Sequence, residues 1–298
     1  MTPKTKTFLE RSFSTIILLA ILGGAIAWDD PLGYGILIAI FCNLTTVEWY
    51  RMLAGRSADR PLVLVGGLIY PWVLLLTAQN IIGSHMGPIT ATLALFCLVL
   101  AGLALFSILA FIRQILAMDY SGKSGRQALA DAAETILAFI YPVWLFGFSF
   151  FFCFKGATQD CHFLLWLILV TKMSDIWAYV TGVLTGGKFI TRRFSPAVSP
   201  KKSWEGIIGS FIITTILGVL LGLWMQRGLG PTLLAIYSAV IFVIAVFGDL
   251  AGSLIKRGLG VKDSGSLLPG IGGIFDLIDS PSFTVSFTFS AFVVLSLF

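Results

Sequence analysis

Residues 204–226 read WEGIIGSFIITTILGVLLGLWMQ, and this stretch carries one charged residue, Glu205, beside its start. The hydrocarbon core of a bilayer is about 30 Å thick, and an α-helix needs about 20 apolar residues to cross it. The stretch therefore predicts a helix that spans a membrane.

Similar apolar runs fill much of the chain. Hydrophobic residues make up 57% of the sequence and charged residues 12%, whereas a soluble domain is about half apolar and a quarter charged. The second run is the weakest candidate because Asn43 and Glu48 lie within it. We therefore expect an all-α, polytopic integral membrane protein with about nine transmembrane helices. The nine runs cover residues 12–28, 32–50, 61–80, 88–113, 131–154, 162–183, 204–226, 231–250 and 280–298.

The basic residues predict the orientation of these helices. With the N-terminus in the cytosol, 17 of the 20 Lys and Arg residues fall on the cytosolic side. Lys155 and Arg227 fall outside, and Lys172 lies within the sixth run. Cytosolic loops retain Lys and Arg because moving these residues across a membrane is costly. The net charge of +5 therefore reflects orientation, and it does not indicate nucleic-acid binding.

The distribution of charge divides the chain into two regions. We expect residues 1–130 to form a transmembrane scaffold that faces lipid, with Glu48 at the interface beside Trp49. We expect residues 131–298 to form the catalytic region. The four cysteines lack metal-ligand spacing, and both histidines fall on the outer side. Histidine catalysis on the cytosolic side is therefore not expected.

The sixth run carries ionisable residues on one helical face. Lys172, Asp175 and Tyr179 follow the spacing i, i+3, i+7. Such groups within a membrane are costly unless they pair or face a polar cavity. One interpretation is a structural pair between Lys172 and Asp175. The favoured interpretation places Asp175 in an active cavity near its cytosolic mouth.

The loop that follows this run has the features of a phosphate receptor. Lys201 and Lys202 precede Ser203, which can cap the helix that begins at Trp204. A helix N-terminus favours anions because its first N–H groups are unpaired and its dipole is positive there. The alternative is an ordinary cytosolic flank, but Glu205 just inside the membrane favours a functional role.

The last loop contains most of the remaining charge. Asp249, Ser253 and Lys256 lie at i, i+4, i+7, and Asp276 and Asp279 lie at i, i+3. Carboxylates without histidine or cysteine suit Mg²⁺, which prefers oxygen ligands and usually retains substrate phosphate in its shell. Three further cations can neutralise phosphate oxygens, namely Lys256, Arg257 and Lys262. A purely structural salt-bridge network is the alternative.

Three blocks of polar, charged and small residues stand at 174–182, 199–206 and 253–280. They resemble the phosphatidate cytidylyltransferase (CDP-diacylglycerol synthase) family. Two positions depart from the family pattern, since Ile271 replaces a usual His and Leu277 a usual Arg. The resemblance covers roughly residues 170–280, and its third block is the most specific. The blocks are Ser174-Asp175 with Ala178-Tyr179 and Gly182; SPKKSWEG at 199–206; and Ser253-Leu254-Ile255-Lys256-Arg257, Lys262-Asp263, Pro269-Gly270, Gly272-Gly273, Asp276 and Asp279-Ser280.

The resemblance implies that CTP and phosphatidate react to give CDP-diacylglycerol and pyrophosphate, with Mg²⁺ as cofactor. It places the protein in the cell inner membrane as a multi-pass protein whose active site faces the cytosol. The role assignments are hypotheses in three groups. The catalytic group is Asp249, Asp263, Lys256, Arg257 and Asp276; the substrate-binding group is Lys201, Lys202, Ser203, Glu205, Lys262, Asp175 and Ser253; the metal ligands are Asp249, Asp276 and Asp279.

Two other functions are considered beside this one. A CTP-dependent lipid-alcohol kinase would share the nucleotide and the membrane setting, but it would transfer the γ-phosphoryl group. A transporter would use charges within the membrane, although transporters commonly show paired repeats and midplane sites. A homodimer is a further expectation, because the small residues Gly218 and Gly222 permit helix association.

Overall fold

A computed structural model describes the chain as two compact units. Unit 1 comprises Met1–Cys161 with Asp263–Ile278, and unit 2 comprises His162–Lys262 with Asp279–Phe298. The predicted first span, 12–28, lies almost entirely outside the described residues. The described residues are 21, 24, 30–83, 87–153, 161–190, 192–225, 229–269 and 272–296.

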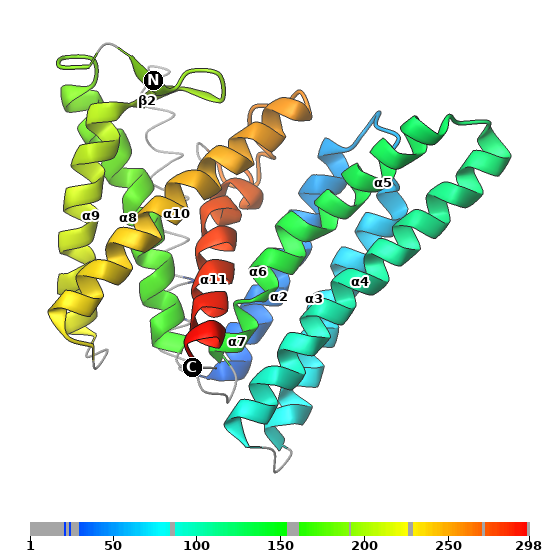
Figure 1. Cartoon of the computed structure of the whole chain (residues 1–298), viewed down its shortest axis with the longest axis horizontal. Helices are drawn as coiled ribbons and strands as arrows, with labels where there is room; N and C mark the ends of the chain where they lie inside the picture. The colour runs from blue at the N-terminus through cyan, green and yellow to red at the C-terminus, as the bar shows by residue number, and fades with distance from the viewer. Residues whose placement is uncertain are drawn as a thin grey trace. The chain divides into compact units, whose positions relative to one another are not determined.

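Unit 1 is a bundle of long helices with short connections. α2 (Pro31–Met52) starts at a clear signal, because Asp30 Oδ1 accepts a hydrogen bond from Leu32 N at 3.2 Å and Pro31 occupies the first turn. Figure 1 shows α2 to α5 running side by side. The elements are α2 (Pro31–Met52), α3 (Arg60–Gly83), α4 (Pro88–Ser121), α5 (Gly125–Phe139), the π-turn η1 (Ile140–Trp144), α6 (Leu145–Gly147) and α7 (Phe150–Cys153).

Aromatic stacking between helices holds unit 1 together. The rings of Phe106 and Phe139 are stacked with centroids 4.0 Å apart. Tyr70 meets Phe139 edge-on at 5.3 Å. Large apolar side chains such as Leu105, Ile108 and Ile115 of α4 are exposed. In a membrane protein this face can contact lipid tails, so its exposure is expected.

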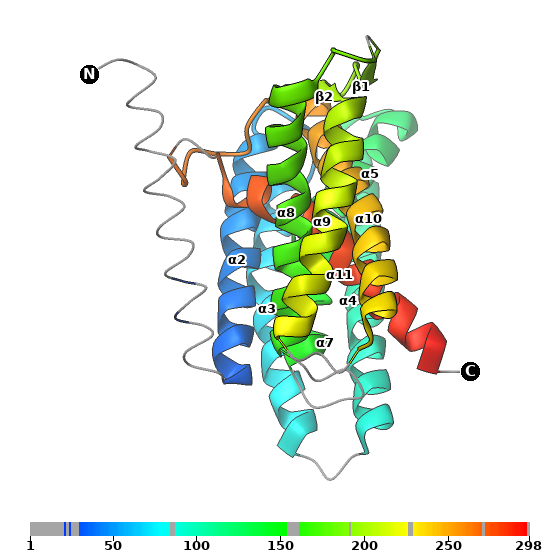
Figure 2. The same cartoon turned by 90° about the vertical axis from the view of Figure 1, so that its left-hand side faces the viewer.

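Unit 2 combines helices with a short β-hairpin. β1 and β2 pair antiparallel, with Arg193 opposite Ser203 and Ser195 opposite Ser199. The hairpin lies at one end of α8 and α9 (Figure 2). α11 starts within unit 1 and continues into unit 2. The elements are α8 (Cys161–Thr185), β1 (Arg193–Ser195), β2 (Ser199–Ser203), α9 (Trp204–Trp224), α10 (Pro231–Gly258) and α11 (Ile274–Ser296).

Small residues bring the helices of unit 2 close together. Thr181 Oγ1 of α8 donates to the Gly206 carbonyl of α9 at 2.9 Å. Trp166 Nε1 donates to the Gly218 carbonyl at 2.9 Å. A Cβ atom at Gly218 would lie 2.9 Å from the Cβ atom of Ser238 in α10, so only glycine permits this packing. Gly218 is therefore used in packing within the chain.

The prediction of a helical, polytopic membrane protein is confirmed. Seven helices among the described residues are long and apolar enough to cross a membrane. The second predicted run, judged weakest, is one of them as α2. α11, with Asp276 and Asp279 near its start, is not among the seven. The total of about nine spans and the cytosolic N-terminus stay predictions, as does the functional division at residue 130.

Candidate active site

Unit 2 gathers lysines and carboxylates from α8, α10 and α11. Lys172 Nζ of α8 lies 3.4 Å from Asp175 Oδ2 and 3.8 Å from Asp279 Oδ1. Lys256 Nζ of α10 lies 3.6 Å from Asp279 Oδ2. Asp279 is 2% exposed, and two lysines lie near its carboxylate. Buried charges require such partners.

Two small residues allow the α11 carboxylate to approach its neighbours. A Cβ atom at Gly252 would lie 2.9 Å from Asp279 Oδ2, which leaves no room for a larger residue on α10. Ser280 N donates to Asp279 Oδ1 at 2.7 Å. Ser280 Oγ lies 3.5 Å from Asp175 Oδ2 and links the carboxylates of α8 and α11. Ser280 belongs to the third block that resembles the family, and the sequence predicts no role for it.

The β-hairpin contributes Lys202 to this group of charged residues. Lys202 Nζ of β2 contacts Asp249 Oδ2 of α10. The negative charge of Asp249 also repels the negative charges of Asp175 and Asp279. Lys201, its neighbour along the strand, is exposed. We refer to Lys172, Asp175, Lys202, Asp249, Lys256 and Asp279 as the charged cluster of unit 2.

Ser203 and Glu205 fix the junction between the hairpin and α9. Ser203 Oγ accepts a hydrogen bond from Gly206 N at 3.1 Å, which is the predicted helix cap. Glu205 Oε1 accepts from three backbone N–H groups in the turn after α8, at 2.8–3.0 Å. Its carboxylate therefore binds the chain itself. The three donors are Gly187, Phe189 and Ile190.

Asp276 belongs to a second network, within unit 1. Its Oδ2 atom accepts from Ser264 N, Ser264 Oγ and Gly273 N, each at 2.9 Å. Ser264 Oγ lies 2.9 Å from Glu48 Oε2 as well. Glu48 is 4% exposed, so its side chain lies inside unit 1, and its predicted position at the membrane interface stays a prediction. We refer to Glu48, Ser264 and Asp276 as the network of unit 1.

The other predicted site residues are spread along α10 and the loop that follows it. Ser253 is half-buried on α10. Arg257 is exposed, and its Nη1 donates to the Val261 carbonyl at 3.2 Å. Lys262 and Asp263 are exposed. Of the two departures from the family pattern, Leu277 is half-buried in α11, and Ile271 lies outside the described residues.

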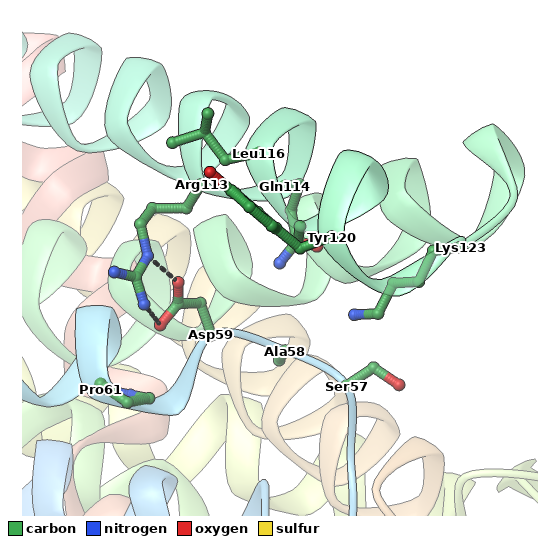
Figure 3. A pocket seen from close by; sticks show the side chains of 10 residues that line it. Ser57, Ala58, Asp59, Pro61, Arg113, Gln114, Leu116, Tyr120 and Lys123 are labelled. Atoms are coloured by element: carbon green, nitrogen blue, oxygen red, sulfur yellow. Dashed lines mark hydrogen bonds and ion pairs between the residues drawn. The ribbon is translucent and has the colours of Figure 1, made fainter.

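A pocket of about 410 Å³ opens in unit 1 beside the loop between α2 and α3. Arg113 Nε donates to Asp59 Oδ2 at 2.7 Å across it, as Figure 3 shows. Lys123 also lines the pocket, and it pairs with Asp131 at 2.9 Å. None of the site residues predicted from the sequence lines this pocket.

These features define a polytopic helical membrane protein with a cluster of half-buried and buried charged residues on α8, β2, α10 and α11. Comparison with known sequences identifies the family of this protein. The cytidylyltransferase family model matches residues 9–295, and the chain belongs to this family.

Three curated relatives share one name, phosphatidate cytidylyltransferase. The Helicobacter pylori (strain J99) protein is 38% identical over 156 residues, which are 52% of this chain and 54% of that protein. The Staphylococcus saprophyticus protein is 32% identical over 160 residues, 54% of this chain and 58% of that protein. The first two matches thus span little more than half of those relatives. The Staphylococcus aureus (strain COL) protein is 27% identical over 251 residues, 84% of this chain and 88% of that protein.

Proposed function

We propose that this protein transfers the cytidylyl group of CTP to phosphatidate, giving CDP-diacylglycerol and pyrophosphate. The observation that carries the proposal is the charged cluster of unit 2, in which three lysines and three carboxylates meet within a membrane protein. The names of the relatives support the same reaction. One substrate is a lipid and the other is soluble, so a membrane protein with a polar cluster suits both.

The reaction requires charge neutralisation more than proton transfer. An oxygen of the phosphatidate phosphate attacks the α-phosphorus of CTP, and the bond from that phosphorus to the oxygen leading to the β-phosphate breaks. Pyrophosphate leaves with the electron pair of that bond. The phosphatidate phosphate is already an anion near neutral pH, so no general base is needed. Cations that neutralise both substrates and stabilise the leaving group provide the catalysis.

Three lysines of the charged cluster are proposed to supply these cations. Lys172, Lys202 and Lys256 each contact a carboxylate in unit 2. In the proposed reaction the phosphate oxygens take over part of these contacts, because a lysine ammonium has three donors and can hold more than one acceptor. Before substrate binds, Asp175, Asp249 and Asp279 keep the ammonium groups in place.

The donor set suits Mg²⁺ that is shared with a substrate. Among the described residues, no group of three or more His, Cys, Asp or Glu side chains converges as a metal site made of protein alone. Mg²⁺ commonly takes one or two carboxylates and completes its shell with water and substrate phosphate. Asp249 and Asp279 are the proposed ligands, and Asp276 stays a predicted third. The ion would supply Lewis-acid stabilisation of phosphate charge.

Several predicted residues take supporting roles in this proposal. Ser203 and Glu205 orient the hairpin that carries Lys202, through the bonds to Gly206 and to the turn after α8. Lys201, Arg257 and Lys262 are exposed, which suits capture of the soluble nucleotide. Asp263 and Ser253 complete the predicted set.

The distribution of basic residues supports an active site that faces the cytosol of a bacterial inner membrane. In unit 1, Arg113 of α4 pairs with Asp59 just before α3, Arg56 of the loop between α2 and α3 pairs with Glu134 of α5, and Lys123 of the loop before α5 pairs with Asp131. In unit 2, basic residues lie on the hairpin and in the last turn of α10. Retention of cations on one side is the general rule for cytosolic loops.

Purified protein incubated with CTP, phosphatidate and Mg²⁺ tests the proposal directly. Radiolabel at the α-phosphate of CTP should enter the lipid, and label at the γ-phosphate should leave with pyrophosphate. Asp249→Asn should abolish the transfer, whereas Asp119→Asn, which changes an exposed carboxylate of α4, should not. Transfer of the γ-label to a lipid alcohol would identify a kinase instead. Failure to transfer either label from fully folded protein would contradict the proposal.

A further inference from the structure

Glu48 of α2 binds the start of α11, which lies more than two hundred residues later in the sequence. Its Oε1 atom accepts from Ile274 N at 2.7 Å, and its Oε2 atom accepts from Phe275 N at 2.9 Å. Ile274 is the first residue of α11. The first N–H groups of a helix lack partners within the helix, and a negative charge beside them is favourable. Glu48 therefore acts as a cap from a distant helix.

The same carboxylate reaches Asp276 through one hydroxyl group. Ser264 Oγ lies 2.9 Å from Glu48 Oε2 and 2.9 Å from Asp276 Oδ2. Ser264 N and Gly273 N also donate to Asp276 Oδ2. Glu48 and Asp276 thus both contact Ser264, and Asp276 also accepts hydrogen bonds from the backbone of this loop.

The glycines of this loop leave room for the two carboxylates. A Cβ atom at Gly272 would lie 2.6 Å from Asp276 Oδ2, and its φ of +130° is one that other residues rarely adopt. A Cβ atom at Gly265 would lie 2.9 Å from Glu48 Oε1. A Cβ atom at Gly273 would overlap both Ser264 Oγ and Glu48 Oε2. The glycine-rich stretch is therefore shaped around the network of unit 1.

Packing alone does not account for a carboxylate at position 48. The neighbouring Trp49 meets Phe275 edge-on at 5.3 Å, so apolar contacts already join α2 to α11. Burying a carboxylate is costly unless it accepts hydrogen bonds, and here the N–H groups of Ile274 and Phe275 donate to it while the Ser264 hydroxyl is shared between it and Asp276. The hydrogen bonds thus stabilise the buried negative charge of Glu48.

We propose that Glu48 is a positioning residue, which fixes Asp276 and the start of α11 in the geometry that the reaction requires. It acts through Ser264 and the N–H groups of Ile274 and Phe275, and it does not touch substrate. This inference rests on the proposed function, because Asp276 is one of the carboxylates assigned to the reaction. It gives Glu48, which lies in the region predicted to be a lipid-facing scaffold, a part in the reaction.

Glu48→Gln tests the inference with little change of shape. The amide has one acceptor oxygen, so it cannot accept hydrogen bonds at both ends as the carboxylate does. Its contacts with Ser264, Ile274 and Phe275 should therefore weaken. Loss of an outer residue that orients a metal ligand typically costs about 10–100-fold in activity or metal affinity. We expect the turnover number to fall by about that factor and the Mg²⁺ requirement to rise, while the KM for phosphatidate stays unchanged.

Ser264→Ala provides a second variant, because it removes the bridging hydroxyl and leaves Glu48 in place. Glu134→Gln is the matched control, since Glu134 of α5 is partly exposed and pairs with Arg56 at 3.6 Å. Hydrogen–deuterium exchange in detergent-solubilised protein should show faster exchange at 264–276 in both test variants and no change in the control.

The outcomes separate this inference from the proposed function. If the wild-type protein makes no CDP-lipid, the proposed function fails, and the exchange rates alone decide whether Glu48 holds the loop. If the wild-type protein is active and folded Glu48→Gln keeps its turnover and Mg²⁺ requirement, the positioning role is overturned. Unchanged exchange at 264–276 in both test variants overturns it as well.

Discussion

Lys256 Nζ lies 3.6 Å from Asp279 Oδ2, and both side chains are buried in unit 2. Lys172 Nζ lies 3.8 Å from the other oxygen of the same carboxylate. Asp279 thus contacts two lysines that come from different helices. A buried ion pair of this kind contributes little net stability against an apolar replacement, yet the loss of one partner is costly. The arrangement is therefore better explained by function than by stability.

Asp279→Asn should destabilise the protein more than Lys256→Met does. The first change deprives two lysines of a carboxylate, and removal of one partner from a buried pair costs about 3–5 kcal/mol. The second leaves Asp279 with Lys172. Unfolding in detergent, followed by circular dichroism, measures the difference. Asp119→Asn, on the exposed end of α4, is the control. Equal stability of the two cluster variants would show that Lys172 does not support Asp279.

An exchange of charges between Lys202 and Asp249 should separate structure from catalysis. Each single change, Lys202→Asp or Asp249→Lys, places like charges together and should destabilise unit 2. The double variant restores an ion pair and should regain stability. Its activity should remain at least about 100-fold below wild type, because the cation and the carboxylate now face the wrong substrate groups.

The matched control for this exchange is Arg193→Gln, which removes an exposed cation from the other strand of the hairpin. It should retain both stability and turnover. Recovery of activity in the double variant would mean that the pair between Lys202 and Asp249 serves only to hold the hairpin on α10.

Glu205→Gln should loosen the turn between α8 and the hairpin. The Oε1 atom accepts from Gly187, Phe189 and Ile190, and a neutral amide oxygen is a weaker acceptor than a carboxylate. Hydrogen exchange at 187–190 should therefore accelerate, and the KM for CTP should rise because the hairpin positions Lys202. Glu134→Gln serves as the control. A raised KM without faster exchange would point instead to direct contact between Glu205 and the nucleotide.

The sequence predicted the helices well because each apolar run satisfies a simple length requirement. It also predicted the cap at Ser203, since a serine before an apolar run is a local signal. The hairpin at 193–203 was missed, and its Lys, Pro and Ser residues give no alternation of apolar and polar side chains.

The network of unit 1 could not be predicted, because its partners are far apart in the sequence. Glu48 stands beside Trp49 at the end of an apolar run, which is the usual pattern of a residue at the membrane interface. Only its bonds to Ile274 and Phe275 distinguish it. The one available signal was a carboxylate within a membrane segment, which is a functional hypothesis by default.

Gly218→Val should destabilise the protein without changing its oligomeric state. The small residues of α9 were predicted to permit association between two copies, but Gly218 faces Ser238 of α10 in the same chain. Extra atoms in a tightly packed contact cost about 1–3 kcal/mol. Gly258→Ala, at the end of α10 where a Cβ atom meets open space, is the control and should be tolerated. Light scattering in detergent would give the molar mass of each variant. Dissociation of a wild-type dimer by Gly218→Val would contradict this assignment, because a residue used only within the chain has no reason to affect association.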